Sequence, residues 1–445
     1  MDGTVTVAEA HAVGGWKTVL LASMGGGAQG VFALDVSDPA SFAGGGRALF
    51  EFGDADDPDM GYVIGTPAIA KFRAYAKEGA PDYRYFAVVS SGMNNYKNDG
   101  AGRFNQDASG ALFLLSLDKP PSAKWQLGVN YYKYRTPSKD AGVQNGLSAP
   151  ALVTGADGAV RYAYAGDMQG NLWRFDFTGA APWNDALAGT TPLFMATDDK
   201  GKRQPLTTQP RVAFAPGGGY VVLIGTGKFI EEDDAAKGKF STQSFYGVLD
   251  AMKSDYAASG RADLASRSLE KVNGAFKITG AELSYDANIT GAKGWYFDFP
   301  DSATGERSVT NPMLINGLLF FNTLIPGSDP CDAGGGRSYV VDTLSGMPAN
   351  GGVTGHLSAV GMLSAPVPFE TGTEVGERNA IGRRAVKKKY SVVNFGTGAK
   401  TASGTGVAAG GAAVGEKIEI KPPAGRFSWR EIPNWQELRN AKTSK

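Results

Sequence analysis

Residues 162–176 read YAYAGDMQGNLWRFD: an apolar run, a turn between Gly166 and Gly170, and a second apolar run that closes on Asp176. The same order recurs in four other segments, residues 19–35, 86–118, 220–250 and 318–342. Apolar runs rich in β-branched and aromatic residues, separated by glycine-containing turns, are typical of β-hairpins. A hairpin that recurs without helical periodicity between its copies predicts a blade architecture, and therefore an all-β propeller.

A proline precedes an apolar run at five places, which are Pro67, Pro150, Pro210, Pro312 and Pro366. Because proline cannot donate to a central ladder, each is expected at the start of the innermost strand of a blade. The spacings between these prolines are 83, 60, 102 and 54 residues. Such uneven spacing predicts a modified, irregular β-propeller of six to seven blades with long loop insertions.

We predict one β-propeller domain over residues 1–445, with an ordered core over about residues 16–432. Insertions are expected at residues 93–109, 177–206 and 251–292, with a short helix near residues 263–269 in the last of them. Residues 399–416 are rich in Gly, Ala, Ser and Thr, which predicts a flexible loop. Residues 425–432 are expected to form a strand that closes the sheet edge of the first blade.

Composition excludes several classes of protein. The 44 basic residues balance the 44 acidic ones, so net charge does not favour a nucleic-acid partner. No uninterrupted apolar stretch reaches the ~18 residues of a membrane span. The first residues lack the pattern of a signal peptide, and the early start of blade-like sequence favours a domain of a longer protein. Cys331 is the only cysteine, which excludes an internal disulfide but leaves open whether it is free or pairs with another segment.

Two glycine-rich motifs resemble nucleotide-binding loops. Residues 25–30 have the spacing G-x-G-x-x-G, but a strand-like run follows where a dinucleotide site needs a helix. Residues 225–228 read GTGK, but Phe229 replaces the Ser or Thr that would hold magnesium. We interpret both as turns between strands. Only His11 and His356 are present, and no G-x-S-x-G motif occurs, so we assign no catalytic, cofactor-binding or metal-binding residue.

Each of three charged runs allows two interpretations. Residues 54–59 hold four carboxylates, which form either a solvated loop or a cation site. Residues 231–234 are similar and favour plain surface. Residues 383–389 are basic and form either a solvated, strand-leading loop or a contact for an acidic partner.

The chain resembles the PilY/PilC proteins, which are type IV pilus biogenesis factors and tip-associated adhesins. The resemblance rests on motifs in family order over about residues 16–432, namely GVFALDVSDP at 30–39, GYVIGTP at 61–67, YAGDMQGNLWRFD at 164–176, TQSFYG at 242–247 and FNTLIP at 321–326. Of these, the run at 164–176 is the most specific.

The resemblance implies the C-terminal propeller domain of a longer secreted protein, located at the cell surface, the pilus tip or the outer membrane. It implies a non-enzymatic role that supports pilus extension, opposes retraction and mediates adhesion, in a family linked to twitching motility. Minor pilins of the pilus tip complex are the implied partners, with a host-surface ligand as a further candidate.

Members of this family carry a calcium loop of alternating acidic residues directly before the Tyr-Ala-Gly-Asp run. Here the corresponding residues 154–162 read TGADGAVRY, in which Asp157 is the remaining expected carboxylate. Thr154 and Arg161 stand near positions that are normally Asp. Calcium takes about six to eight oxygen ligands. We therefore predict that this loop is degenerate and binds no calcium, so that the chain needs no cofactor.

Two other functions stay open on the sequence. A quinoprotein-like propeller oxidoreductase also contains hairpins that end in Leu-x-x-Leu-Asp, although no cofactor-binding ring can be assembled from these residues. A generic propeller scaffold is the third candidate.

Overall fold

The computed structural model describes residues 2–397 and 411–420, except for residues 41–46, 78–79, 94, 97, 99, 101–102, 108, 139–142, 144, 188, 190, 254–257, 286–290, 301, 328–331, 333, 349–351 and 379–383. The described residues form strands and no α-helix. Their helical turns are short 3-10 segments: η1 (Gly25–Gly27), η3 (Glu232–Ala235), η4 (Arg261–Asp263) and η5 (Ser302–Thr304).

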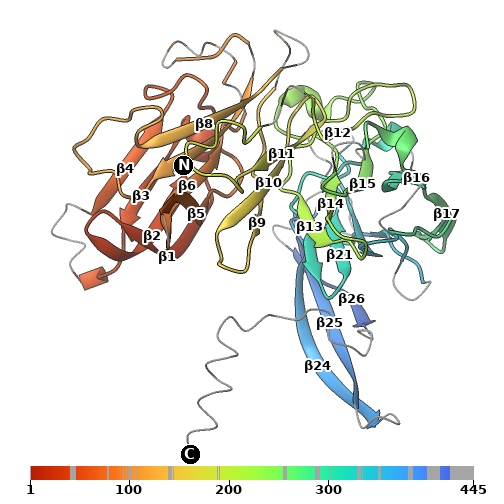
Figure 1. Ribbon diagram of the computed structural model, residues 1–445. Helices are drawn as coiled ribbons and strands as arrows, with labels where there is room; N and C mark the ends of the chain where they lie inside the picture. Colours follow the sequence, from red (N-terminus) through yellow and green to blue (C-terminus); the bar gives the residue numbers. More distant parts are fainter. Residues whose placement is uncertain are drawn as a thin grey trace, which may run out of the picture. The chain divides into compact units, whose positions relative to one another are not determined.

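Five sheets of four or five strands follow one another along the chain (Figure 1). In sheet order, the first two are β1 (Val5–Ala12), β2 (Gly15–Ser23), β3 (Gly30–Asp35), β4 (Ala48–Gly53), and β5 (Ala68–Lys77), β6 (Ala80–Ser90), β7 (Gly110–Ser116), β8 (Tyr131–Thr136). The third is β12 (Phe194–Met195), β11 (Asn171–Asp176), β10 (Val160–Gly166), β9 (Ala151–Thr154). The fourth sheet has five strands, β13 (Arg211–Phe214), β14 (Tyr220–Gly225), β15 (Ser244–Asp250), β19 (Gly294–Asp298) and β16 (Ala265–Ser266). The fifth sheet has four strands, β20 (Met313–Ile315), β21 (Leu318–Asn322), β22 (Arg337–Asp342) and β23 (His356–Leu357).

Two further sheets complete the described strands. A hairpin of β17 (Ser268–Val272) and β18 (Ala275–Thr279) lies within the insertion at 251–292. The three-stranded sheet is β24 (Val367–Arg378), β25 (Arg384–Gly396) and β26 (Gly411–Ile420). The described residues therefore contain six sheets of three or more strands, and the number of blades stays a prediction.

All five predicted hairpins are confirmed. They are the antiparallel pairs β2–β3, β6–β7, β10–β11, β14–β15 and β21–β22, and none of these strands lies at an edge of its sheet. The glycine motif at 25–30 is the turn between β2 and β3, and the motif at 225–228 begins the loop between β14 and β15. The apolar runs are therefore the middle strands, which need both neighbours for their backbone hydrogen bonds.

The closing aspartates end their strands by a local hydrogen bond. Carboxylate oxygens of Asp35, Asp176, Asp250 and Asp342 each accept the backbone N–H two residues later, at 2.8–3.1 Å. Aspartate favours such turns because its side chain replaces a backbone acceptor. The recurring Asp is thus the residue that turns the chain out of the sheet.

Each of the five prolines stands one residue before a strand that lies at the edge of its sheet, β5, β9, β13, β20 or β24. Hydrogen bonds join these segments from sheet to sheet. Gln209 Nε2 donates to the carbonyl oxygen of Pro150 at 2.8 Å, and the backbone N–H of Gln209 donates to Asn311 Oδ1 at 2.9 Å. Each proline therefore directly precedes an edge strand, as its missing N–H favours, whereas the prediction that these are the innermost strands stays a prediction. The residues beside Pro150, Pro210 and Pro312 fix neighbouring sheets to one another.

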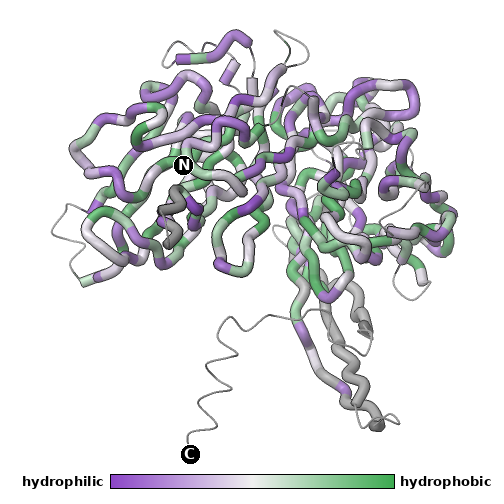
Figure 2. The backbone as a smooth tube through the Cα atoms, viewed as in Figure 1, coloured by the Kyte–Doolittle hydropathy of each residue, from purple (hydrophilic) through white to green (hydrophobic). Residues whose placement is uncertain are grey.

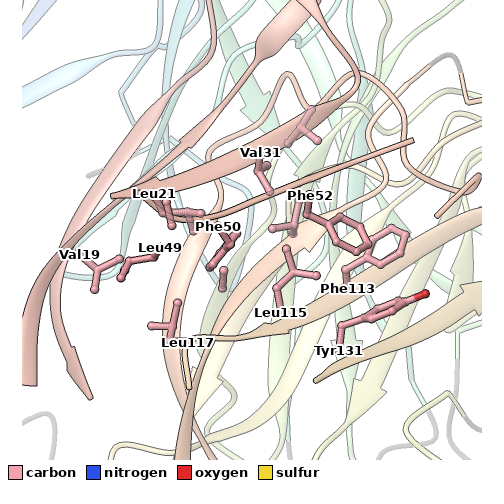
Figure 3. Close-up of a cluster of buried hydrophobic side chains, with 14 of the residues drawn as sticks. Val19, Leu21, Val31, Leu49, Phe50, Phe52, Phe113, Leu115, Leu117 and Tyr131 are labelled. Carbon is pink, nitrogen blue, oxygen red and sulfur yellow. The ribbon is translucent and has the colours of Figure 1, made fainter. Parts of the chain in front are cut away.

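The core lies between the faces of successive sheets. Between the first two sheets, Val19, Leu21, Val31 and Phe52 meet Phe113, Leu115 and Tyr131 (Figure 3). Phe52 is fully buried and its ring contacts those of Phe113 and Tyr131 at 5.4 and 5.2 Å between centroids. Burying one such side chain is worth about 1.5–3 kcal/mol. Figure 2 shows the same pattern along the chain, with hydrophobic strands and hydrophilic connecting loops.

The contacts of the chain form two compact units: residues 1–366 with 394–413, and residues 367–393 with 414–445. β1 begins at Val5, so strand structure begins before residue 16, and residues 411–416 belong to β26 instead of a loop. The short helix expected near residues 263–269 is wrong, because η4 ends at Asp263 and strands β16 and β17 follow. Residues 398–410 and 421–445 lie outside the described residues, so the boundary at 432 and the closing strand stay predictions.

Among the described residues, no helix has both the length and the apolar character that a membrane crossing requires.

Candidate functional site

Residues 154–162, where the resemblance implies a calcium loop, contain the end of β9, a turn at 155–159 and the start of β10. Gly155 donates its N–H to the carbonyl oxygen of Ala159 at 2.8 Å, and Gly158 donates to Gly155 at 2.9 Å. Gly158 has φ +73°, a conformation that L side chains rarely adopt. The turn is therefore closed by its own backbone, with the side chain of Asp157 at its centre.

The carboxylate of Asp157 is held by three donors. Arg161 Nη2 and the hydroxyl of Tyr83 each lie 2.9 Å from Oδ2, and the N–H of Ala159 lies 3.1 Å from Oδ1. Burial alone would raise the pKa of Asp157, but these hydrogen bonds and the charge of Arg161 outweigh it and hold the pKa below its usual value. The ammonium of Lys71 adds a second cation, 4.7 Å from the centre of the Tyr83 ring.

This set of groups does not match the ligand set of calcium. Calcium binds about six to eight oxygens at short range. The turn supplies one carboxylate, which already forms an ion pair with the guanidinium of Arg161. A positive side chain at this distance occupies the region of negative potential that a cation needs. The arrangement is that of an internal salt bridge.

The acidic run at 54–59 divides into exposed and buried carboxylates. Asp57 and Asp59 are buried, whereas Asp56 is exposed. Lys133 Nζ lies 2.9 Å from Asp57 Oδ1 and 2.7 Å from Asp59 Oδ2, and Arg135 Nε lies 3.1 Å from Asp59 Oδ2. Neither of our interpretations described this arrangement, because the protein's own β8 supplies the cations for the two buried carboxylates.

Lys133 and Arg135 are the charged residues that the sequence analysis missed at this place. They alternate with Tyr132 and Tyr134 along β8, so both lie on one face of the strand. The available signal was this alternation, in which two cations occupy one face of a strand whose other face is aromatic. It indicates a basic face, but it does not identify Asp57 and Asp59 as the partners.

The insertion at 93–109 is anchored to the same network. Asn95 Nδ2 donates to the carbonyl oxygens of Asp59 and Ser109, at 2.9 and 3.1 Å. Asn105 Nδ2 donates to Asp59 Oδ1. Asn95 and Asn105 are both buried. These bonds fix two points of the insertion to the sheets beneath it, which makes its described part a positioned loop.

Other conspicuous residues have structural roles. The large aromatic side chains of Trp183, Tyr131 and Tyr134 are at most 7% exposed and belong to the core. His11 forms an exposed contact with Asp118, at 3.3 Å between Nδ1 and Oδ1. From Arg384 onward, the basic run at 383–389 belongs to β25 instead of a loop, but its side chains lie outside the described residues, as does Cys331.

The specific run at 164–176 is organised by Asp167, which is fully buried. Its two carboxylate oxygens accept from the N–H groups of Gln169 and Asn171, from Asn171 Nδ2, and from the indole Nε1 of Trp173 at 2.8 Å. Burial raises the pKa of Asp167, and these hydrogen bonds act in the opposite direction. The motif is therefore a hairpin whose turn and core tryptophan are tied to one carboxylate.

Comparisons with known proteins agree with this architecture. Residues 1–274 match the family model described as the PilY1 beta-propeller domain. The type IV pilus biogenesis factor PilY1 of Pseudomonas aeruginosa strain PAO1 is 31% identical over 384 residues, which cover 78% of this chain and 30% of that protein. A homolog from Xylella fastidiosa strain Temecula1 is 30% identical over 387 residues, covering 81% of this chain and 24% of that protein.

The crystal structure of the Pseudomonas aeruginosa PilY1 C-terminal domain has the same fold. It superposes with a TM-score of 0.60 and 24% identity, over 86% of this chain and 81% of that one. The chain thus spans about a third or less of the curated relatives that it matches. These relatives are named as biogenesis factors and not as enzymes. With a family model matched over residues 1–274 of 445, the chain belongs to the PilY1 beta-propeller domain family.

Proposed function

We propose that the chain acts in type IV pilus biogenesis as a non-enzymatic propeller that supports pilus extension, opposes retraction and contributes to surface adhesion through protein contacts. The observation that carries this proposal is the similarity to named pilus biogenesis factors over 78–81% of the chain. The fold supports it, because a propeller presents rigid sheets whose loops are free for recognition.

The insertion at 93–109 is the contact surface that the geometry supports best. Asn95 and Asn105 hold its described part through Asp59, so little ordering entropy is lost when a partner binds. Minor pilins of the tip complex are the proposed partners, with a host-surface ligand as a second one. The proposed location is the cell surface or pilus tip, as part of a longer secreted protein.

We further propose that the turn at 154–162 works without calcium. Arg161 and Tyr83 supply the contacts to Asp157 that a bound cation would otherwise supply. Under this proposal the turn is closed at every calcium concentration, and pilus extension does not depend on calcium binding at this position.

The test is deletion of this segment from its full-length protein in the host, with surface pili counted in strains with and without the retraction motor. The proposal is supported if the deletion removes surface pili and if pili reappear in the strain without the retraction motor. Immunoblotting confirms that the shortened protein is present. The Asp157→Ala variant serves as the matched test of the calcium proposal and is expected to leave the number of pili at the wild-type level.

Unchanged piliation in both strains would refute the proposed role. A visible absorption change when the purified chain is incubated with a quinone cofactor would favour the quinoprotein-like oxidoreductase instead.

A further inference from the structure

Three segments of the larger unit meet around a hollow of about 250 Å³. They are residues 202–205 after β12, the loop 226–243 between β14 and β15, and residues 305–308 before β20. We call it the basic hollow; its lining includes Lys202, Arg203, Lys228, Lys239 and Arg307, together with Asp233 and Asp234.

Backbone hydrogen bonds hold the three segments together. The N–H of Gly227 donates to the carbonyl oxygen of Pro205 at 2.8 Å, and the N–H of Ser308 donates to that of Thr226 at 2.9 Å. The walls of the basic hollow are therefore joined before any ligand arrives, which lowers the entropic cost of binding.

The acidic residues of the loop form ion pairs with two of the lysines. Lys228 Nζ lies 2.6 Å from Glu231 Oε2 and 3.3 Å from Asp234 Oδ1, and Lys239 Nζ lies 2.8 Å from Asp233 Oδ2. Asp234 also accepts the N–H groups of Ile230 and Glu231, each at 2.9 Å. These carboxylates are therefore already engaged and do not neutralise Arg307 by direct contact.

Arg307 is a buried cation whose direct partners are neutral. It is 7% exposed, and its Nε and Nη1 donate to the carbonyl oxygens of Gly305, Lys228 and Asp234 at 2.8–2.9 Å. The ring of Phe240 lies 5.1 Å from its Cζ. Within the described part of the chain, Nη2 donates no hydrogen bond to the protein. Burial lowers the pKa of Arg307, so a nearby anion would stabilise its charged form.

Lys202 contributes a second cation from another side. Its side chain is exposed and makes no ion pair with a described residue. Arg203 donates from Nη1 to neutral oxygens of Gln169 and Asn171, at 3.0 and 3.2 Å. The cations that line the basic hollow thus come from three separate segments of the chain.

We propose that the basic hollow binds a tetrahedral oxyanion, the phosphate or sulfate group, through Arg307 Nη2 and Lys202. A tetrahedral group offers oxygens in several directions, as donors from separate segments require, whereas a carboxylate offers two oxygens in one plane. Free phosphate and sulfate present this tetrahedral group, and so do phosphate and sulfate monoesters. This site is independent of the turn at 154–162 and of the proposed role in pilus biogenesis.

The test measures binding of inorganic phosphate and inorganic sulfate to the purified chain by calorimetry. Thermal unfolding is followed in parallel, with chloride at equal ionic strength as the reference. Both tetrahedral anions are expected to raise the unfolding midpoint above the chloride value, because a ligand that binds only the folded state stabilises it. Acetate is expected to bind more weakly. Methyl phosphate distinguishes the free ion from a monoester as the ligand. It is expected to bind as phosphate does if the basic hollow accepts monoesters, and not to bind if the hollow accepts only the free ion.

Lys202→Gln is expected to weaken phosphate binding about threefold, as for an exposed charge pair. Lys200→Gln removes an exposed lysine outside the lining and is the matched control, expected to bind as wild type. Asp233→Asn removes an exposed negative charge and is expected to tighten binding. Arg307→Lys loses the planar fork and is expected to weaken binding more than about tenfold.

Circular dichroism shows whether Arg307→Lys folds; if it does not, the comparison of Lys202→Gln with Lys200→Gln decides. The proposal is overturned if phosphate and sulfate act no differently from chloride. It is also overturned if acetate binds as tightly as phosphate, or if Lys200→Gln weakens binding as much as Lys202→Gln.

Discussion

The guanidinium Nη2 of Arg161 lies 2.9 Å from Oδ2 of Asp157, four residues earlier in the turn between β9 and β10. The two side chains are about three-quarters buried, so solvent screens the pair only in part. A cation carried by the chain itself is present at every calcium concentration. The turn therefore has a constant electrostatic environment.

Calcium is expected to leave the turn unchanged. At about 1 mM calcium, within the range that extracellular modules bind, the unfolding midpoint should equal that in excess chelator. Arg161→Ala is expected to lower the free energy of unfolding by about 1 kcal/mol, because Asp157 loses a charge-assisted hydrogen bond. Chelator-sensitive binding that disappears in Asp157→Ala would contradict this prediction.

Lys133→Met is expected to destabilise the protein by about 3 kcal/mol, because Asp57 and Asp59 would keep buried charges without their shared partner. Denaturant unfolding measures the change. Lys124→Met, on an exposed side chain, is the control and should change stability by less than about 0.5 kcal/mol. Adding Asp57→Asn to Lys133→Met should restore part of the loss. An effect of Lys133→Met no larger than the control would show that the buried carboxylates do not need this cation.

Local patterns in the sequence predicted the hairpins and the leading prolines, because both depend on residues close together in the chain. The partner of Asp57 could not be predicted in this way, because Lys133 is 76 positions away. The bond between Gln209 and Asn311 spans 102 positions. Such contacts depend on how sheets stack, and β-pattern alone does not contain that information.

The turn between β9 and β10 also combines a partner that is near in the sequence with one that is distant. Arg161 lies four positions from Asp157, and the sequence analysis placed it near a position that is normally Asp in the family. Tyr83 belongs to β6 of the neighbouring sheet, 74 positions away, and its hydroxyl became visible only in the folded chain. The sequence therefore predicted which ligands are lacking and left open which groups replace them.

Asp35 should contribute stability that is lost in acid. Burial raises its pKa, but the bonds from Lys17 and Ser37 outweigh this and lower the pKa to about 2. The unfolded chain, with an ordinary aspartate near ~3.9, therefore binds more protons between these values. The contribution, up to about 2 kcal/mol, is complete above the unfolded pKa and decreases as pH falls toward 2.

The measurement for Asp35 is the difference in unfolding free energy between wild type and Asp35→Asn from neutral pH down to pH ~2. We expect a constant difference at neutral pH and a smaller one in acid. Asp82→Asn, at an exposed carboxylate, controls for the loss of one negative charge. A difference that grows as pH falls would have the wrong sign for a lowered pKa.

Asp167→Asn should lower the free energy of unfolding by about 2 kcal/mol, although asparagine and aspartate have side chains of nearly the same shape. The side chains and N–H groups around Asp167 all act as donors, and an amide offers them one oxygen and one NH2 group. If the amide oxygen takes the place of Oδ1, the indole N–H of Trp173 is left without an acceptor; the opposite orientation leaves the turn N–H groups of Gln169 and Asn171 unpaired. An unpaired buried donor costs about 1–3 kcal/mol. Asp199→Asn, at an exposed carboxylate in the turn after β12, is the matched control. Denaturant unfolding in the Trp173→Phe background provides the decisive comparison: the cost of Asp167→Asn should shrink there, and an equal cost in both backgrounds would show that the indole bond does not carry it.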